Sequence, residues 1–131
     1  MSWYHLTWDA DSEKHPNVPK EMAILLCSNP FNVRKIGRPI ESTIVFRMTD
    51  YEKDIKDLYN AICGHFKGSF NCILSRVDNV THKDKTRHVY IVGKGMPKEH
   101  ETPFGTILNE LKEKGEIDND VENANVDWAL S

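Results

Sequence analysis

The sequence lacks the features that mark several protein classes. No run of apolar residues approaches the roughly 18 that cross a membrane, and the first residues do not have the basic and then apolar order of a signal peptide. The chain has no serine elbow, no HExxH motif, no Walker loop and no internal repeat. We therefore expect a cytoplasmic protein that needs no cofactor and lies outside the most recognisable enzyme classes.

Cysteine is scarce, with three residues in 131 and no CxxC pair. Cys27, Cys63 and Cys72 each stand among apolar neighbours, which indicates reduced packing residues rather than a disulfide framework. A metal site would have to combine Cys63 and Cys72 with His65 and His82. Because Cys63 and His65 are two apart on a predicted helix, they point to different faces, and we expect no metal.

The bulk composition is that of an ordinary globular chain, with 39% hydrophobic and 28% charged residues. At this length folding buries roughly two thirds of the surface of the unfolded chain, so the core needs no disulfide or metal. We expect one domain over residues 1–117. The acidic stretch over residues 118–131 has no clean period and is predicted to be a tail, partly ordered by Val126, Trp128 and Leu130.

Two amphipathic helices are well marked. Thr49 to Glu52 has the form of a capping box, and apolar residues then recur at spacings of three and four until Gly64 and Gly68. The second helix is predicted between Thr102, a cap, and Gly115, a stop, with Pro103 at its first position. Each pattern indicates a helix with one face in the core.

Four strands accompany these helices. Ser69–Val77 and Thr86–Gly93 are rich in β-branched and aromatic residues and read as an antiparallel hairpin with a long loop. Ser42–Met48 and Ser2–Trp8 are further strands. The predicted fold class is α+β, with a mainly antiparallel sheet of about four or five strands and two amphipathic helices packed on one face.

Two segments between the first strands are harder to interpret. The apolar run KEMAILLCSN, Lys20–Asn29, suits either a buried strand or a short buried helix, and we favour the strand. Phe31–Ile40 contains Gly37 and Pro39 and is interpreted as a surface loop.

Charge is distributed unevenly along the chain. From Lys67 to Lys98 seven basic residues face two acidic ones, for a net charge of +5, whereas Glu99 to the end carries −7. A folded hairpin would concentrate the basic residues in one basic patch. Arg34 and Arg38, from the predicted loop Phe31–Ile40, would extend this patch. The candidate ligand-binding residues are Lys83, Lys85, Arg87, His88, Tyr90, Lys94, Arg34 and Arg38. The alternative is that these are solvated surface charges.

Val92–Pro97, VGKGMP, places two glycines around a lysine at the end of a predicted strand. Free backbone amides there could form an anion-binding nest. A glycine turn that closes the strand explains the same residues equally well.

Two histidines suggest a possible catalytic site. Strand alternation places His5 and Thr7 on one face of the first strand, and His88 and Tyr90 on one face of another. One histidine would act as base and the other as acid on a phosphodiester, while the hydroxyls hold the phosphoryl oxygens. The pattern resembles the hHhTh motifs of the two-histidine (2H) phosphoesterases, which lie on central strands, although Tyr90 stands where that family has Thr or Ser.

The leading hypothesis is a small binding module without enzymatic activity. It would recognise a phosphate-bearing ligand, either a nucleotide or single-stranded nucleic acid such as RNA, through the basic hairpin, with Tyr90 stacking on a base. One alternative is a regulator or inhibitor that binds a protein partner or forms a homo-oligomer. The second alternative is a 2H-like phosphodiesterase that uses His5 and His88.

Overall fold

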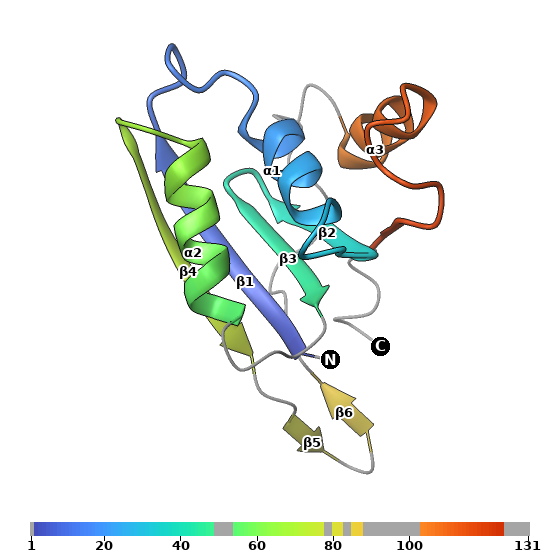
Figure 1. The fold of residues 1–131 in the computed structure, drawn as a ribbon. Helices are drawn as coiled ribbons and strands as arrows, with labels where there is room; N and C mark the ends of the chain where they lie inside the picture. The colour runs from blue at the N-terminus through green and yellow to red at the C-terminus, as the bar shows by residue number, and fades with distance from the viewer. Residues whose placement is uncertain (1, 49–53, 78–79, 83–84, 88–102, 125–131) are drawn as a thin grey trace.

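The computed structural model describes residues 2–48, 54–77, 80–82, 85–87 and 103–124 (Figure 1). Along the chain its elements are β1 (Ser2–Ala10), α1 (Val18–Cys27), β2 (Lys35–Ile40), β3 (Thr43–Met48), α2 (Asp54–His65), β4 (Phe70–Val77), β5 (Val80–His82), β6 (Lys85–Arg87), α3 (Phe104–Glu113) and β7 (Glu122–Asn123).

Five of the strands form one sheet, in the order β4-β1-β3-β2-β7. Every neighbouring pair is antiparallel except β2 and β7, which are parallel. The first six elements therefore follow the βαββαβ order of the split βαβ, or ferredoxin-like, arrangement, with β1 and β3 in the centre. The predicted α+β class and mainly antiparallel sheet are confirmed.

The core lies on one side of this sheet. Tyr4, Leu6 and Trp8 alternate along β1 and belong to the main hydrophobic cluster, together with residues of α1, α2 and α3. The rings of Tyr4 and Phe46 stack across β1 and β3 with their centroids 5.5 Å apart. Figure 1 shows α1 and α2 in front of the strands, which is the side on which this cluster lies. We call the opposite side of the sheet the outer face.

The segment favoured as a strand at Lys20–Asn29 is instead the helix α1, so that prediction was wrong. Its buried residues include Val18, Met22 and Leu26, spaced four apart on one helical face. A proline stands in the first turn, where its missing amide costs no hydrogen bond. The described residues thus contain three helices, where the sequence predicted two.

The loop predicted at Phe31–Ile40 contains β2, so the interpretation of residues 35–40 was also wrong. An added Cβ on Gly37 would lie 2.4 Å from the carbonyl oxygen of Ala124, so glycine is required because another backbone segment approaches closely. The register between β2 and β3 shifts between Gly37 and Ile40, and Pro39 lies inside this irregular stretch.

The predicted hairpin is different in the structure. The strand at Ser69–Val77 is present as β4, but it pairs with β1. Thr86 and Arg87, the first residues of the second predicted strand, pair with Thr81 and Val80. Thr81 and Val80 lie in the segment that was expected to be the loop of the hairpin. The remainder of the predicted strand, residues 88–93, lies outside the described residues.

The carboxyl end of α3 agrees with the sequence, whereas Pro103, predicted at the first helical position, is the N-cap of this helix, and α2 continues through Gly64 to His65. α3 ends before Gly115, which has a positive φ of 70°. The capping box at Thr49–Glu52, the cap at Thr102 and the apolar residues of the tail, Val126, Trp128 and Leu130, lie outside the described residues. The boundary after residue 117 stays a prediction, but residues 118–124 contact the sheet through β7. None of the described helices has the length and apolar character needed to cross a membrane.

Candidate functional site

The central strands carry a polar row on the outer face, formed by His5, Thr7 and Thr43. His5 and Thr7 alternate with the core residues of β1, and Thr43 is directly opposite Thr7 on β3. The prediction that His5 and Thr7 share one face is confirmed by their contact, in which Thr7 Oγ1 lies 3.0 Å from His5 Nε2. Thr7 Oγ1 also lies 3.2 Å from Thr43 Oγ1.

The three side chains therefore form a hydrogen-bonded chain across two strands. If His5 Nε2 is unprotonated, Thr7 donates to it and can accept from Thr43. If Nε2 carries the proton, it donates to Thr7 and the hydroxyl turns to donate towards Thr43. The row is therefore connected with either assignment of hydrogen to Nε2.

The neighbours of the row are partly apolar. His5 is opposite Val45 on β3 and Ser75 on β4. Trp3, Thr43 and Val45 are 4%, 5% and 2% exposed although Trp3 and Val45 do not belong to the main hydrophobic cluster. His5, Thr7 and Ser75 are half-buried. The row therefore offers imidazole and hydroxyl groups at a site only partly open to solvent, where hydrogen bonds are stronger than in water.

The two arginines assigned to the basic patch have structural contacts. Arg34 Nη2 lies 2.7 Å from Asp118 Oδ2, and its Nε lies 3.2 Å from Asp120 Oδ1. Arg34 Nη1 also donates to the carbonyl oxygens of Cys27 and Val33. These bonds fix Arg34 between α1 and the segment that leads to β7.

Arg38 donates through Nε to the carbonyl oxygen of Glu41 at 2.7 Å, and burial lowers its pKa. It thus closes the turn between β2 and β3.

The remaining predicted residues belong to the segment from Lys83 to Pro97. Lys83, His88, Tyr90 and Lys94 lie outside the described residues, as does the glycine segment Val92–Pro97. Lys85 and Arg87 are described only as backbone positions of β6. It is still a prediction that the basic residues of this segment converge in space and that His88 approaches His5.

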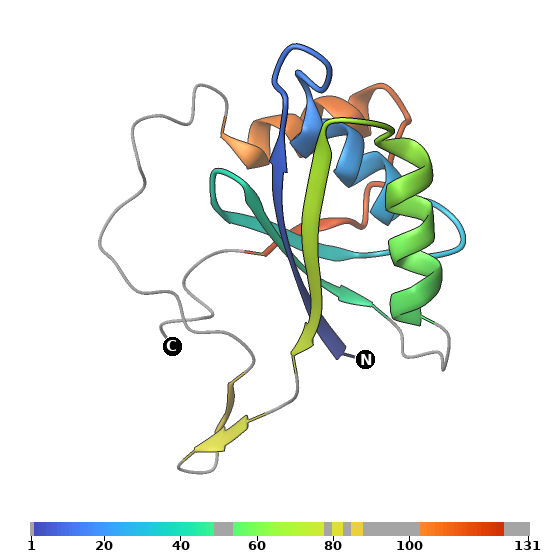
Figure 2. The same cartoon turned by 90° about the vertical axis from the view of Figure 1, so that its left-hand side faces the viewer.

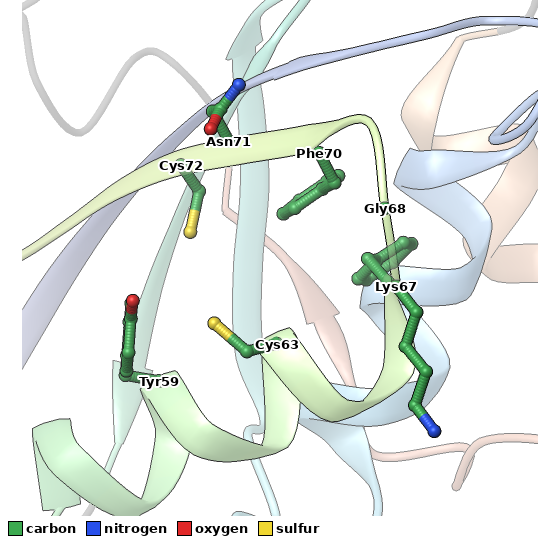
Figure 3. Close-up of a pocket in the computed structure, with 8 residues that line it drawn as sticks. Tyr59, Cys63, Lys67, Gly68, Phe70, Asn71 and Cys72 are labelled. Carbon is green, nitrogen blue, oxygen red and sulfur yellow. The ribbon is translucent and has the colours of Figure 1, made fainter.

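Sequence reasoning missed a pocket beside β4, with a volume of about 410 Å³. Its lining residues are Tyr59, Cys63, Phe66, Lys67, Gly68, Phe70, Asn71 and Cys72. Cys63 was predicted to be a packing residue and is exposed, whereas Phe70 is partly buried and packs against the main cluster. Figure 3 shows the Cys63 and Cys72 sulfurs on facing sides of the pocket.

Tyr59 and Cys63, four residues apart, are neighbours on one face of α2, but this spacing does not indicate that β4 lies beside them. Within the described part of the chain, no group of three or more His, Cys, Asp or Glu side chains is placed to hold a metal ion.

No protein-family model, curated protein or solved structure shows a significant match to this chain. The function is therefore argued from the residues themselves.

Proposed function

We propose that this protein binds a phosphate-bearing ligand, a nucleotide or single-stranded nucleic acid, on the outer face of its sheet. The supporting observation is the hydrogen-bonded row of His5, Thr7 and Thr43 on the two central strands. His5 and Thr7 are half-buried and can reach a ligand, whereas the buried Thr43 orients the Thr7 hydroxyl. Hydroxyl and imidazole groups are common donors to phosphate oxygens. Four-stranded sheets also present a face on which RNA-binding domains hold single strands.

The described residues favour contact with phosphate over stacking on a base. Trp3, the aromatic residue of β1 on the outer face, is only 4% exposed and cannot present its ring to a ligand. Arg47, two positions along β3 from Val45, is exposed and supplies a cation near the row. The lysines and arginines predicted from residues 83–94 would add to this charge. A cytoplasmic location, predicted from the sequence, suits a ligand of this class.

Binding is tested by fluorescence anisotropy with a labelled oligouridylate, competed with AMP or with inorganic phosphate. Thr7→Val removes the hydroxyl at constant shape and should weaken binding about tenfold, the value of one to two hydrogen bonds. The matched control is Thr106→Val at an exposed position of α3, which should bind as wild type. Competition by AMP points to a nucleotide site, whereas competition only by longer strands points to nucleic acid.

Affinity for the oligonucleotide should also fall as salt rises, because neutralised phosphates release their counterions. If the wild-type protein binds neither AMP nor oligouridylate at low salt, or if Thr7→Val and Thr106→Val bind equally, the proposal is wrong.

Phosphodiesterase activity is a second candidate, favoured by the 3.0 Å contact of His5 with Thr7 on a central strand. To act as base, His5 Nε2 would exchange its bond with Thr7 for one with a ribose hydroxyl. A 2′,3′-cyclic nucleotide and a 2′–5′-linked dinucleotide are the test substrates. His5→Ala and His88→Ala should each abolish hydrolysis, and a wild-type protein without activity on either substrate would exclude this function.

A further inference from the structure

Two cysteines from different elements converge on the pocket beside β4. Cys63 lies in the last turns of α2 and is exposed, while Cys72 lies on β4 and is half-buried. The close-up in Figure 3 shows their sulfur atoms directed towards one another. The third thiol, Cys27, is buried in the core and only 3% exposed. The two pocket thiols are therefore the pair that a reagent from solvent can reach.

The surroundings distinguish the two thiols. Burial is the main cause that raises the pKa of Cys72, and the charge of Cys63 raises it further, which indicates that the sulfurs interact. Tyr59, one helical turn before Cys63, has its own pKa raised chiefly by a hydrogen bond with Cys63. Cys63 is exposed, whereas Cys72 is half-buried on β4. Cys63 is thus the more accessible nucleophile, and Cys72 is the thiol held behind it.

We propose that Cys63 and Cys72 form a dithiol site that closes to an intramolecular disulfide by exchange with a low-molecular-weight disulfide. In the first step the Cys63 thiolate attacks one sulfur of the disulfide, forms a mixed disulfide and releases one thiolate. In the second step the Cys72 thiolate attacks Cys63 Sγ and releases the other thiolate. The two cysteines lose two protons and two electrons, and the small disulfide is reduced to two thiols.

The new bond would join the end of α2 to β4 across the pocket. This site is separate from the polar row on the outer face, because Cys72 is opposite Trp8, whose side chain is in the core. The proposal is therefore independent of the ligand-binding function.

The test is incubation of the full chain with oxidised glutathione, acid quenching and mass spectrometry without reductant. Wild type should lose about 2 Da, the mass of two hydrogen atoms. Because Lys67 lies between the two cysteines, trypsin should release two peptides joined by the Cys63–Cys72 bond. Cys72→Ser should stop at a stable glutathione adduct on Cys63, and Cys63→Ser should not form the bond. Cys27→Ser is the matched control and should behave as wild type.

Alignment by the fold is tested by comparing native protein with protein in urea. The attack of Cys72 on the mixed disulfide at Cys63 should be about tenfold faster in the native state, because the fold already orients the two sulfur atoms. The proposal is overturned by a wild-type product that keeps glutathione, by a bond that includes Cys27, or by a native rate no higher than that in urea.

Discussion

At one edge of the sheet β2 is covered by the parallel strand β7, whereas at the other edge β4 pairs only with β1 among the described residues. We call these the closed edge and the open edge. The closed edge is held by backbone bonds from Glu122 to Arg34 and from Ala124 to Ile36, both 2.7 Å long. The ion pairs of Arg34 with the preceding aspartates reinforce it.

The open edge has a different character. In Figure 2 β4 lies nearest to the viewer with α2 beside it. β4 contains one charged residue, Arg76, and no lysine or proline, the residues that usually protect an edge strand from pairing with another chain. Ile73 is 70% exposed in its middle. At the closed edge, close packing should make the free energy of unfolding sensitive to substitution. At the open edge, β4 leaves space for the pocket that contains Cys63 and Cys72.

The largest effect is expected at Gly37 on the closed edge. Gly37→Ala places a methyl group 2.4 Å from the carbonyl oxygen of Ala124, so β2 and β7 must separate. We expect a loss of about 2 kcal/mol in the free energy of unfolding by urea. The control is Gly64→Ala on α2, where an added Cβ meets nothing within 4 Å and should stabilise the helix by up to about 1 kcal/mol. Equal stability of the two variants would contradict the close contact.

Alkaline pH should weaken the protein through Cys27, beside the closed edge. Burial raises the pKa of Cys27 from 9.0 to about 12. The thiol therefore ionises first in the unfolded chain, and its contribution to stability is complete below pH 9 and is lost as the pH rises towards 12. At pH 10 the loss is about 1.4 kcal/mol. Urea unfolding at pH 8 and pH 10 should show this difference in wild type and Cys63→Ser, and a much smaller one in Cys27→Ala, where the raised pKa of Cys72 still contributes.

Arg34→Gln should have a smaller effect on the closed edge. It removes two ion pairs whose carboxylates are 71% and 70% exposed, and such pairs contribute about 1 kcal/mol or less. Most of the loss should disappear in 1 M salt, where the Debye length is about 3 Å. Lys14→Gln, at an exposed position, is the control. A loss that is independent of salt would assign the role of Arg34 to its bonds with the Cys27 and Val33 carbonyls.

Ile73→Ala on the open edge should change stability least, by under about 0.5 kcal/mol, because the side chain is 70% exposed. Ile40→Ala, 55% exposed on β2, is its counterpart at the other side of the sheet. A loss above about 1 kcal/mol that depends on protein concentration would show that a second copy covers the open edge.

Regular periodicity made much of the fold predictable. β1, β3, α2 and α3 follow strand alternation or helical spacing, and their positions agree with the sequence where they are described. α1 was missed because a ten-residue apolar run suits a buried strand as well as a helix. β2 was missed because Gly37 and Pro39 are typical of loops, whereas glycine is needed here for a contact with Ala124, far along the chain.

The site was predictable only within single strands. Alternation placed His5 and Thr7 on one face, but Thr43 joins them from 36 residues away from Thr7, and only the sheet register reveals this. The pocket thiols were missed for the same reason. No local sequence pattern indicates that β4 pairs with β1 and thereby brings Cys72 beside α2.

The central position of β1 has a consequence for biosynthesis. This strand leaves the ribosome before the rest of the sheet, yet its first partner, β3, follows 36 residues later at the Thr7–Thr43 contact, and β4 comes later still. At about 5–20 residues per second, the nascent chain carries Trp3, Tyr4, Leu6 and Trp8 without their sheet partners for a few seconds. The apolar face of β1 therefore has to wait for β3 and β4 before the sheet can bury it.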